Sequence, residues 1–97
     1  MKILKVMSLA LPEIKVIQYK RFTDERGYFT EAFNKAEFDS NVELSFLKDT
    51  QFVQANESYS KKNAVRGLHF QWSPYQAKLI RTVFGHMTDL IMDIRKG

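Results

Sequence analysis

The sequence predicts an all-β fold, a sandwich or barrel of short strands, and three observations support this prediction. Short apolar runs rich in β-branched and aromatic side chains recur along the 97 residues, as strands require. Residues that favour turns separate these runs at regular intervals. Aromatic residues make up 13% of the chain, which can supply one core. We therefore expect a single domain over residues 1–97.

The segments with strand composition follow one another with short breaks. They lie at residues 2–11, 13–22, 27–33, 50–58, 63–72, 77–85 and 87–95. Lys5 interrupts the first apolar run and leaves it too short for a secretory leader, so we interpret it as a strand. Turns are expected at the sequences DERG (24–27), SKKN (60–63), SPY (73–75) and FGH (84–86).

One segment is predicted to be helical. In NKAEFDSNVELSFL, residues 34–47, Asn34 precedes Glu37 by three positions, a spacing typical of a helix start in which Asn34 is the cap. A short helix is therefore expected near residues 34–40.

Composition narrows the function classes. The absence of cysteine excludes disulfide scaffolds and thiolate metal sites and fits a cytoplasmic protein. No apolar run approaches the roughly eighteen residues of a membrane span. A net charge of +4 favours anionic partners. The basic residues are scattered, so we expect a small phosphorylated ligand and no nucleic acid.

The stretch AVRGLHFQWSPYQAKLIRTVFG, residues 64–85, contains the main chemical signal. Alternation along a strand would place Gly67, His69 and Gln71 on one face. A turn at Pro74 would bring Lys78 back beside His69, and Asp89 would follow in a third strand.

A histidine, a cation and a carboxylate in one pocket suit proton abstraction next to a carbonyl. The imidazole accepts the proton, the ammonium stabilises the enolate oxygen and the carboxylate stabilises the imidazolium. The spacing alone also fits a simpler alternative, in which His69 is a partly buried polar residue, Lys78 a surface charge and Asp89 a turn residue.

Four ordered motifs resemble the nucleoside-diphosphate-4-keto-6-deoxysugar 3,5-epimerases of the rhamnose pathway, the dTDP-4-dehydrorhamnose 3,5-epimerase family. The motifs, which together cover nearly the whole chain, are LPEIKVIQYKRFTDERGYFTEAFN (with the F-x-D-x-R-G-x-F-x-E signature), FVQANESYS, AVRGLHFQ and QAKLIRTVFGHMTDLIMDIRKG.

The resemblance implies a cupin-type antiparallel jelly roll that works as a homodimer on a dTDP-linked sugar, without metal or organic cofactor. It implies that His69 removes the protons from C3 and C5 of the 4-keto sugar, with help from Asp89, while Lys78 contacts the substrate and stabilises the enolate.

The resemblance also implies a set of substrate-binding residues. They are Arg26, Glu31, Gln54, Asn56 and Arg66, in addition to Lys78. Arg66 and His69 point oppositely on a regular strand, so this assignment requires a local twist at Gly67 or an Arg66 that precedes the strand. The alternatives are a turn arginine paired with Asp24 or Glu25 for Arg26, and a solvated strand charge for Glu31.

Members of the family are longer, so we expect this chain to represent the N-terminal part of an incomplete jelly roll. The resemblance places the tyrosine that reprotonates the sugar, and another histidine, beyond these motifs, and no tyrosine of this chain is assigned that role. His86 does not complete a metal site with His69, because Gln71 stands where metal-dependent cupins have a second histidine.

Two other functions stay open. One is a non-catalytic half-cupin that binds a nucleotide sugar or only self-associates, and the other is a 3-epimerase or keto-isomerase of the same family. Because a half jelly roll leaves strand edges unpaired, we expect self-association with exchange of the N-terminal strand. The sequence does not specify the sugar, the nucleotide base or the number of carbons epimerised.

Overall fold

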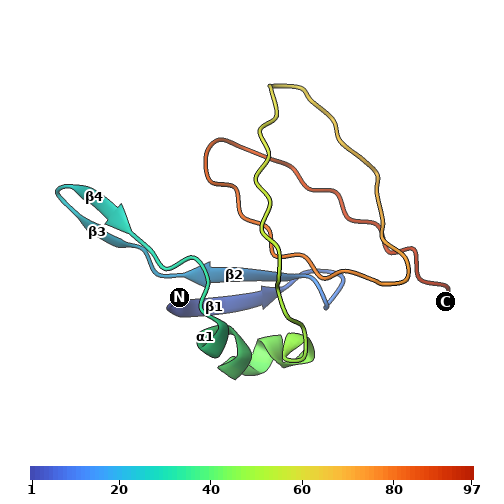
Figure 1. Ribbon diagram of the computed structural model, residues 1–97, viewed down its shortest axis with the longest axis horizontal. Coiled ribbons are helices and arrows are strands. Elements are labelled where there is room, and N and C mark those ends of the chain that lie inside the picture. The colour runs from blue at the N-terminus through green and yellow to red at the C-terminus, as the bar shows by residue number, and fades with distance from the viewer. The chain divides into compact units, whose positions relative to one another are not determined.

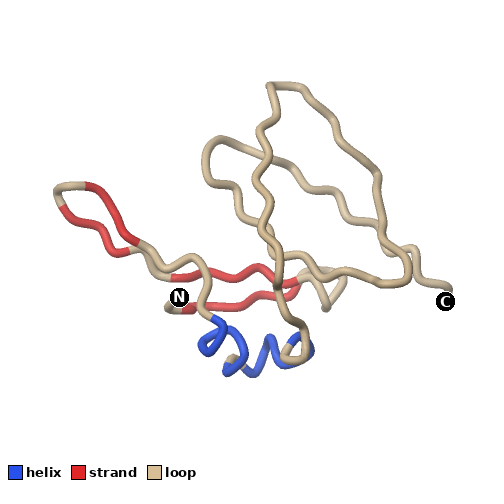
Figure 2. The backbone as a smooth tube through the Cα atoms, in the orientation of Figure 1, coloured by secondary structure: helices blue, strands red, loops and turns tan.

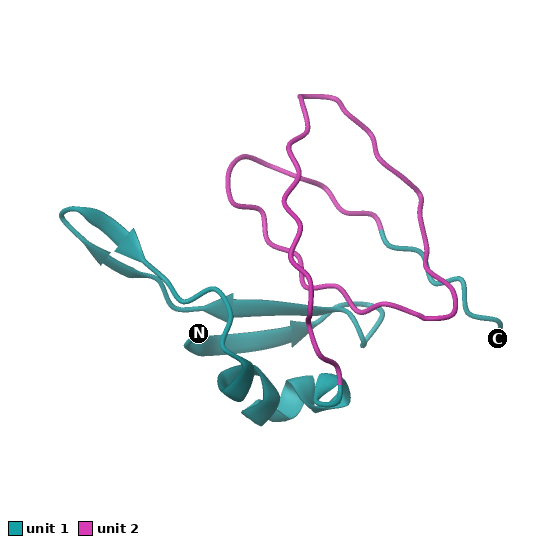
Figure 3. Cartoon of the chain, viewed as in Figure 1, with its two compact units in different colours: residues 1–49, 91–97 teal, residues 50–90 magenta.

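The computed structural model describes all of residues 1–97 (Figure 1). The chain divides into two compact units (Figure 3). Unit 1 comprises residues 1–49 and 91–97, and unit 2 comprises residues 50–90. All the helices and strands belong to unit 1.

The first sheet of unit 1 consists of two antiparallel strands, β1 (Ile3–Ser8) and β2 (Lys15–Tyr19). Val6 pairs with Ile17 and Ser8 with Lys15. The connection is closed by a hydrogen bond from Leu9 N to Ile14 O at 3.0 Å. The predicted strands at both places are confirmed, because their β-branched residues alternate with polar ones as a half-buried strand requires.

The second sheet is the hairpin of β3 (Phe22–Asp24) and β4 (Gly27–Phe29). Its loop has two residues, Glu25 and Arg26, which the DERG sequence predicted. Gly27 has φ +138, a conformation that side chains disfavour and glycine adopts readily. The glycine therefore allows β4 to begin directly after the loop.

The predicted helix is confirmed as α1 (Lys35–Ser40). Asn34 is its N-cap, and the Oδ1 atom accepts a hydrogen bond from Glu37 N at 3.1 Å. A 3-10 helix, η1 (Val42–Leu47), follows at once, and Asn41 both ends α1 and caps η1. The side chain of Asn41 does so by accepting from Glu43 N at 3.0 Å.

The buried core lies in unit 1 and is small. Its members are Met1, Val6, Phe38 and Leu44. Phe38 and Leu44 are 2% and 1% exposed, and the Phe33 and Phe38 rings lie 5.6 Å apart. Each of the two helices thus contributes one fully buried side chain.

Unit 2 consists of turns and irregular chain (Figure 2). The expected turns are present at Lys62–Asn63, Ser73–Pro74 and Phe84–Gly85. The expected strands at residues 50–58, 63–72, 77–85 and 87–95 are not formed. A turn is held by contacts within about four residues, whereas a strand needs a paired neighbour. The structure provides no such neighbour for these segments.

The coarser part of the fold prediction is therefore confirmed: the regular structure consists mainly of short antiparallel strands, with little helix. None of the helices has the length and apolar character that crossing a bilayer demands.

Candidate functional site

Arg26 lies at the tip of the β3–β4 hairpin and is engaged with Asp24. Its backbone N donates to Asp24 Oδ1 at 2.9 Å, and its Nη2 atom donates to Asp24 Oδ2 at 2.7 Å. These hydrogen bonds from Arg26 hold the pKa of the Asp24 carboxyl below its usual value. The turn pairing considered for Arg26 is thus present, and the Arg26 side chain remains 88% exposed, open to a second anion.

Glu31 forms an ion pair with the amino group of Met1. The Met1 side chain is buried and that of Glu31 is half-exposed. Sequence reasoning missed this pair, because 30 positions separate the two residues and no sequence pattern reports a contact with the chain terminus. Glu31 is therefore a paired carboxylate in this structure.

Gln54 and Asn56 are brought together by a hydrogen bond from Gln54 Nε2 to Asn56 Oδ1 at 3.1 Å. Both side chains are exposed. Residues two apart share a face wherever the chain is extended. The two amides can therefore offer donors and acceptors to the same polar ligand.

Arg66 closes the loop that precedes it. Its Nε atom donates to Ser60 Oγ at 2.8 Å and its Nη2 atom to Tyr59 O at 2.9 Å. A backbone hydrogen bond from Ala64 N to Lys61 O, at 3.1 Å, completes the turn inside this loop. The guanidinium thus has a structural role here, and the fork keeps further N–H donors for an anion.

His69, Lys78 and Asp89 all lie in unit 2 and are exposed. No hydrogen bond or ion pair joins any two of them. Their expected proximity depended on pairing among the three strands that are not formed. The chain supplies the imidazole, the ammonium and the carboxylate, but this structure does not assemble them.

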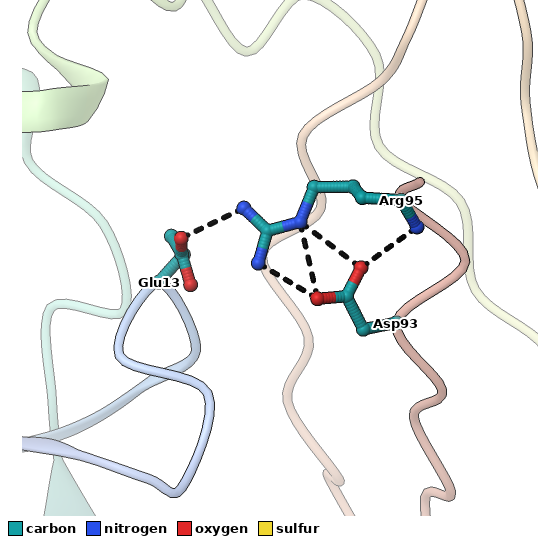
Figure 4. Close-up of polar contacts among 3 residues, drawn as sticks. All are labelled: Glu13, Asp93 and Arg95. Atoms are coloured by element: carbon teal, nitrogen blue, oxygen red, sulfur yellow. Dashed lines mark hydrogen bonds and ion pairs between the residues drawn. The ribbon is translucent and has the colours of Figure 1, made fainter. Parts of the chain in front are cut away.

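The most perturbed carboxyl pKa belongs to a group outside the predicted site. We call Glu13, Asp93 and Arg95 the Arg95 cluster (Figure 4). Arg95 donates from Nη2 to Asp93 Oδ2 at 2.8 Å and from Nη1 to Glu13 Oε1 at 2.8 Å. These hydrogen bonds lower the pKa of Asp93 to about 2 and also lower the pKa of Glu13. In return, the two carboxylates raise the pKa of Arg95.

Aromatic side chains form two exposed features that the site prediction did not include. The Arg21 guanidinium lies 3.9 Å from the centre of the Tyr28 ring, a cation–π arrangement. In unit 2, the Trp72 and Tyr75 rings are 6.3 Å apart. Sequence reasoning had only the aromatic content as a signal, which does not distinguish core rings from exposed ones.

A shallow hollow of about 390 Å³ lies in unit 1, beside β1, β2 and the base of the hairpin. Its lining residues are Leu4, Ile17, Gln18, Tyr19, Arg21 and Thr30. None of the predicted site residues lines it. No group of three or more His, Cys, Asp or Glu side chains is arranged to hold a metal ion.

Comparison with known proteins identifies relatives over almost the whole chain. A Shigella flexneri protein named dTDP-4-dehydrorhamnose 3,5-epimerase is 42% identical over 95 residues, which are 97% of this chain and 50% of that protein. Proteins of the same name from Salmonella typhimurium and Neisseria gonorrhoeae are 46% and 40% identical, over 94% and 95% of this chain and 48% and 26% of their own.

The chain thus spans half or less of the length of these curated relatives. No solved structure matches it. The family model described as dTDP-4-dehydrorhamnose 3,5-epimerase matches residues 8–97. A match over so much of the sequence, joined to relatives of one name, shows that the chain belongs to the dTDP-4-dehydrorhamnose 3,5-epimerase family.

Proposed function

We propose that the protein acts in the epimerisation of a dTDP-4-keto-6-deoxyhexose at C3 and C5, in the biosynthesis of dTDP-rhamnose. The observation that carries this proposal is the family match over residues 8–97, a range that includes His69, Lys78 and Asp89. These three residues supply the base, the cation and the supporting carboxylate that the reaction needs.

The proposed chemistry begins at the C–H bond next to the C4 ketone. His69 takes the proton, the electron pair of the broken bond forms a double bond to C4, and the ketone oxygen becomes an enolate. Lys78 stabilises this negative oxygen, and Asp89 stabilises the imidazolium. An acid on the other face then returns a proton to carbon, and the resemblance assigns this step to a tyrosine outside these motifs.

Binding of the nucleotide is assigned to the polar residues of both units. Arg66 and Arg26 offer guanidinium forks to the diphosphate, and Gln54, Asn56 and Glu31 offer hydrogen bonds to the nucleoside. The exposed position of Arg26 beside the rings of the hairpin supports this assignment. Cations next to exposed rings suit an anion that carries a flat base.

The architecture proposed for the functional protein follows from the same resemblance. It is a single-domain cupin-type jelly roll, to which this chain contributes the N-terminal part. It works as a cytoplasmic homodimer, with exchange of the N-terminal strand between subunits, and needs no metal or organic cofactor. These statements are predictions.

A second candidate function is a binding module without catalysis. The observation that favours it is the exposure of His69, Lys78 and Asp89 without any hydrogen bond between them. Such a module would bind a dTDP-sugar through its cationic and amide side chains, or only self-associate. A 3-epimerase or keto-isomerase would use the same three residues on fewer carbons or on a different product.

The test is solvent exchange in deuterium oxide. The dTDP-linked 4-keto-6-deoxyglucose is incubated with this chain, and separately with the same chain extended by the part of the Salmonella typhimurium relative that it does not match. We expect deuterium at C3 and C5 with the extended protein, detected by proton NMR. His69→Ala should abolish the incorporation, whereas His86→Ala, which removes the other of the two histidines, should keep it.

The outcomes separate the candidates. Absence of deuterium from both carbons in the extended protein rejects catalysis. Calorimetric binding of dTDP without exchange then supports the binding module. Deuterium at one carbon, or a shifted carbonyl in the product, supports the 3-epimerase or the keto-isomerase.

A further inference from the structure

Unit 2 exposes an unusual amount of apolar side chain for a folded protein. We call residues 64–90 the apolar segment. Its large exposed side chains are Val65, Leu68, Phe70, Trp72, Tyr75, Leu79, Ile80, Val83, Phe84, Met87 and Leu90. Their exposed fractions range from 43% at Leu79 to 97% at Phe84. A series of this size indicates a surface that another molecule covers.

The backbone of the apolar segment limits what that molecule can be. The segment contains no helix or strand, so its N–H and C=O groups have no ladder partners. Covering such a backbone without supplying hydrogen bonds would cost several kcal/mol for each unpaired group. Lipid tails supply no hydrogen bonds, and a helix uses its own backbone groups internally. A β-strand supplies both an apolar face and a free edge.

We propose that the apolar segment is a docking surface for β-strands, and that its occupant is a polypeptide equivalent to the part of the relatives that this chain does not match. The Shigella flexneri relative matches 97% of this chain with only 50% of its own length. The Salmonella typhimurium relative does so with 48%. Each of these two relatives therefore carries at least as many further residues as this chain does.

A second copy of the same chain is the other occupant with strands to offer. The apolar segment carries the cations Arg66, Lys78 and Arg81 against the single carboxylate of Asp89. Two copies of the segment paired with each other would bring like charges close together, and such cross-strand pairs are destabilising. Charge therefore favours a different polypeptide over a second copy. The proposal concerns folding and needs no substrate.

The experiment adds the unmatched part of the Salmonella typhimurium relative, as a separate polypeptide, to the full 97-residue chain. Trp72 is the chain's one tryptophan, so 5-fluorotryptophan placed in this chain alone reports this position by fluorine NMR. We expect a one-to-one complex by sedimentation velocity, a shifted fluorine signal and slowed amide hydrogen exchange over residues 64–90.

Two lysine substitutions provide the matched comparison. Phe70→Lys places a charge in the docking surface and should weaken the complex at least about tenfold, because a buried unpaired charge is costly. Val42→Lys alters an apolar side chain that is 81% exposed in η1, outside the apolar segment, and should leave the affinity unchanged.

Three results would overturn the proposal: a fluorine signal unchanged at saturating polypeptide, equal affinity of Phe70→Lys and the parent chain, or a homodimer that protects residues 64–90 without any addition. The last result would assign the surface to a second copy. A complex that forms but lacks deuterium exchange leaves this inference intact and counts only against the proposed catalysis.

Discussion

Arg95 and Glu13 are joined by a hydrogen bond of 2.8 Å from Nη1 to Oε1, across a separation of 82 positions (Figure 4). Glu13 lies in the connection between β1 and β2. The bond therefore attaches residues 91–97, which have no regular structure, to the first sheet of unit 1. Asp93 holds the same guanidinium from within the segment.

Breaking this bond should loosen the end of unit 1 without unfolding it. We expect Glu13→Gln to speed amide hydrogen exchange at residues 91–97, because the charge that attracts Arg95 is lost. Surface ion pairs are weak, so the melting temperature should change little. Glu43→Gln, which removes a carboxylate from η1, is the control and should leave exchange at residues 91–97 unchanged. Equal exchange in Glu13→Gln and the parent chain would contradict this role.

Acid should open the Arg95 cluster at an unusually low pH. The pKa of Asp93 falls from 3.8 to about 2 because Arg95 donates hydrogen bonds to it. A lowered carboxyl pKa contributes stability above the unfolded value, and this contribution is lost as the pH falls through the folded value. Attachment of residues 91–97 should therefore persist at pH 3.8 and decline toward pH 2.

Carbon-detected NMR of the Asp93 carboxyl measures this titration directly. In the Arg95→Gln variant the midpoint should rise toward 3.8, the ordinary value of an aspartate. The Arg26→Gln variant, which removes the arginine beside Asp24, should leave the Asp93 midpoint unchanged. A midpoint near 3.8 in the parent protein would contradict the pairing seen here.

Asn34 should determine where α1 begins. Its side chain accepts the hydrogen bond of Glu37 N at 3.1 Å, and loss of such a cap typically costs about 1 kcal/mol. We expect Asn34→Ala to lower the free energy of unfolding of unit 1 by that amount, measured by urea denaturation. Asn34→Asp keeps an acceptor oxygen and should retain most of it. An unchanged value in Asn34→Ala would show that α1 is held by Phe38 alone.

Arg66 should have two separable roles. In this structure it closes the loop from Tyr59 through two side-chain hydrogen bonds. Arg66→Ala should therefore expose the 59–66 loop to limited proteolysis, whereas Arg66→Lys, which keeps the charge but not the planar fork, should protect it partly. If Arg66 also binds the diphosphate, dTDP should slow cleavage in the parent chain and fail to do so in Arg66→Ala.

The features that sequence predicted correctly depend on neighbours in the chain. Asn34 and Glu37 specify a helix start within one turn, and the DERG sequence specifies a two-residue hairpin loop. The turns at Lys62–Asn63 and Phe84–Gly85 depend equally on local preference. Strands β1 and β2 are close enough in the chain to pair with each other.

The features that sequence did not predict depend on distant partners. The strand expected around His69 has the right composition, yet composition does not supply a neighbour for its hydrogen bonds. The same reason leaves His69, Lys78 and Asp89 unassembled. Contacts of Met1 with Glu31 and of Glu13 with Arg95 leave no periodic signal, because surface ion pairs require only opposite charges that happen to meet.

The buried amino end of the chain has a practical consequence for any laboratory that purifies the protein. An affinity tag fused ahead of Met1 converts the ammonium into a neutral amide and removes the cation that faces Glu31. Binding data for Glu31 collected on such a fusion would describe an unmasked carboxylate. A tag that is cleaved to restore the native first residue avoids this artefact.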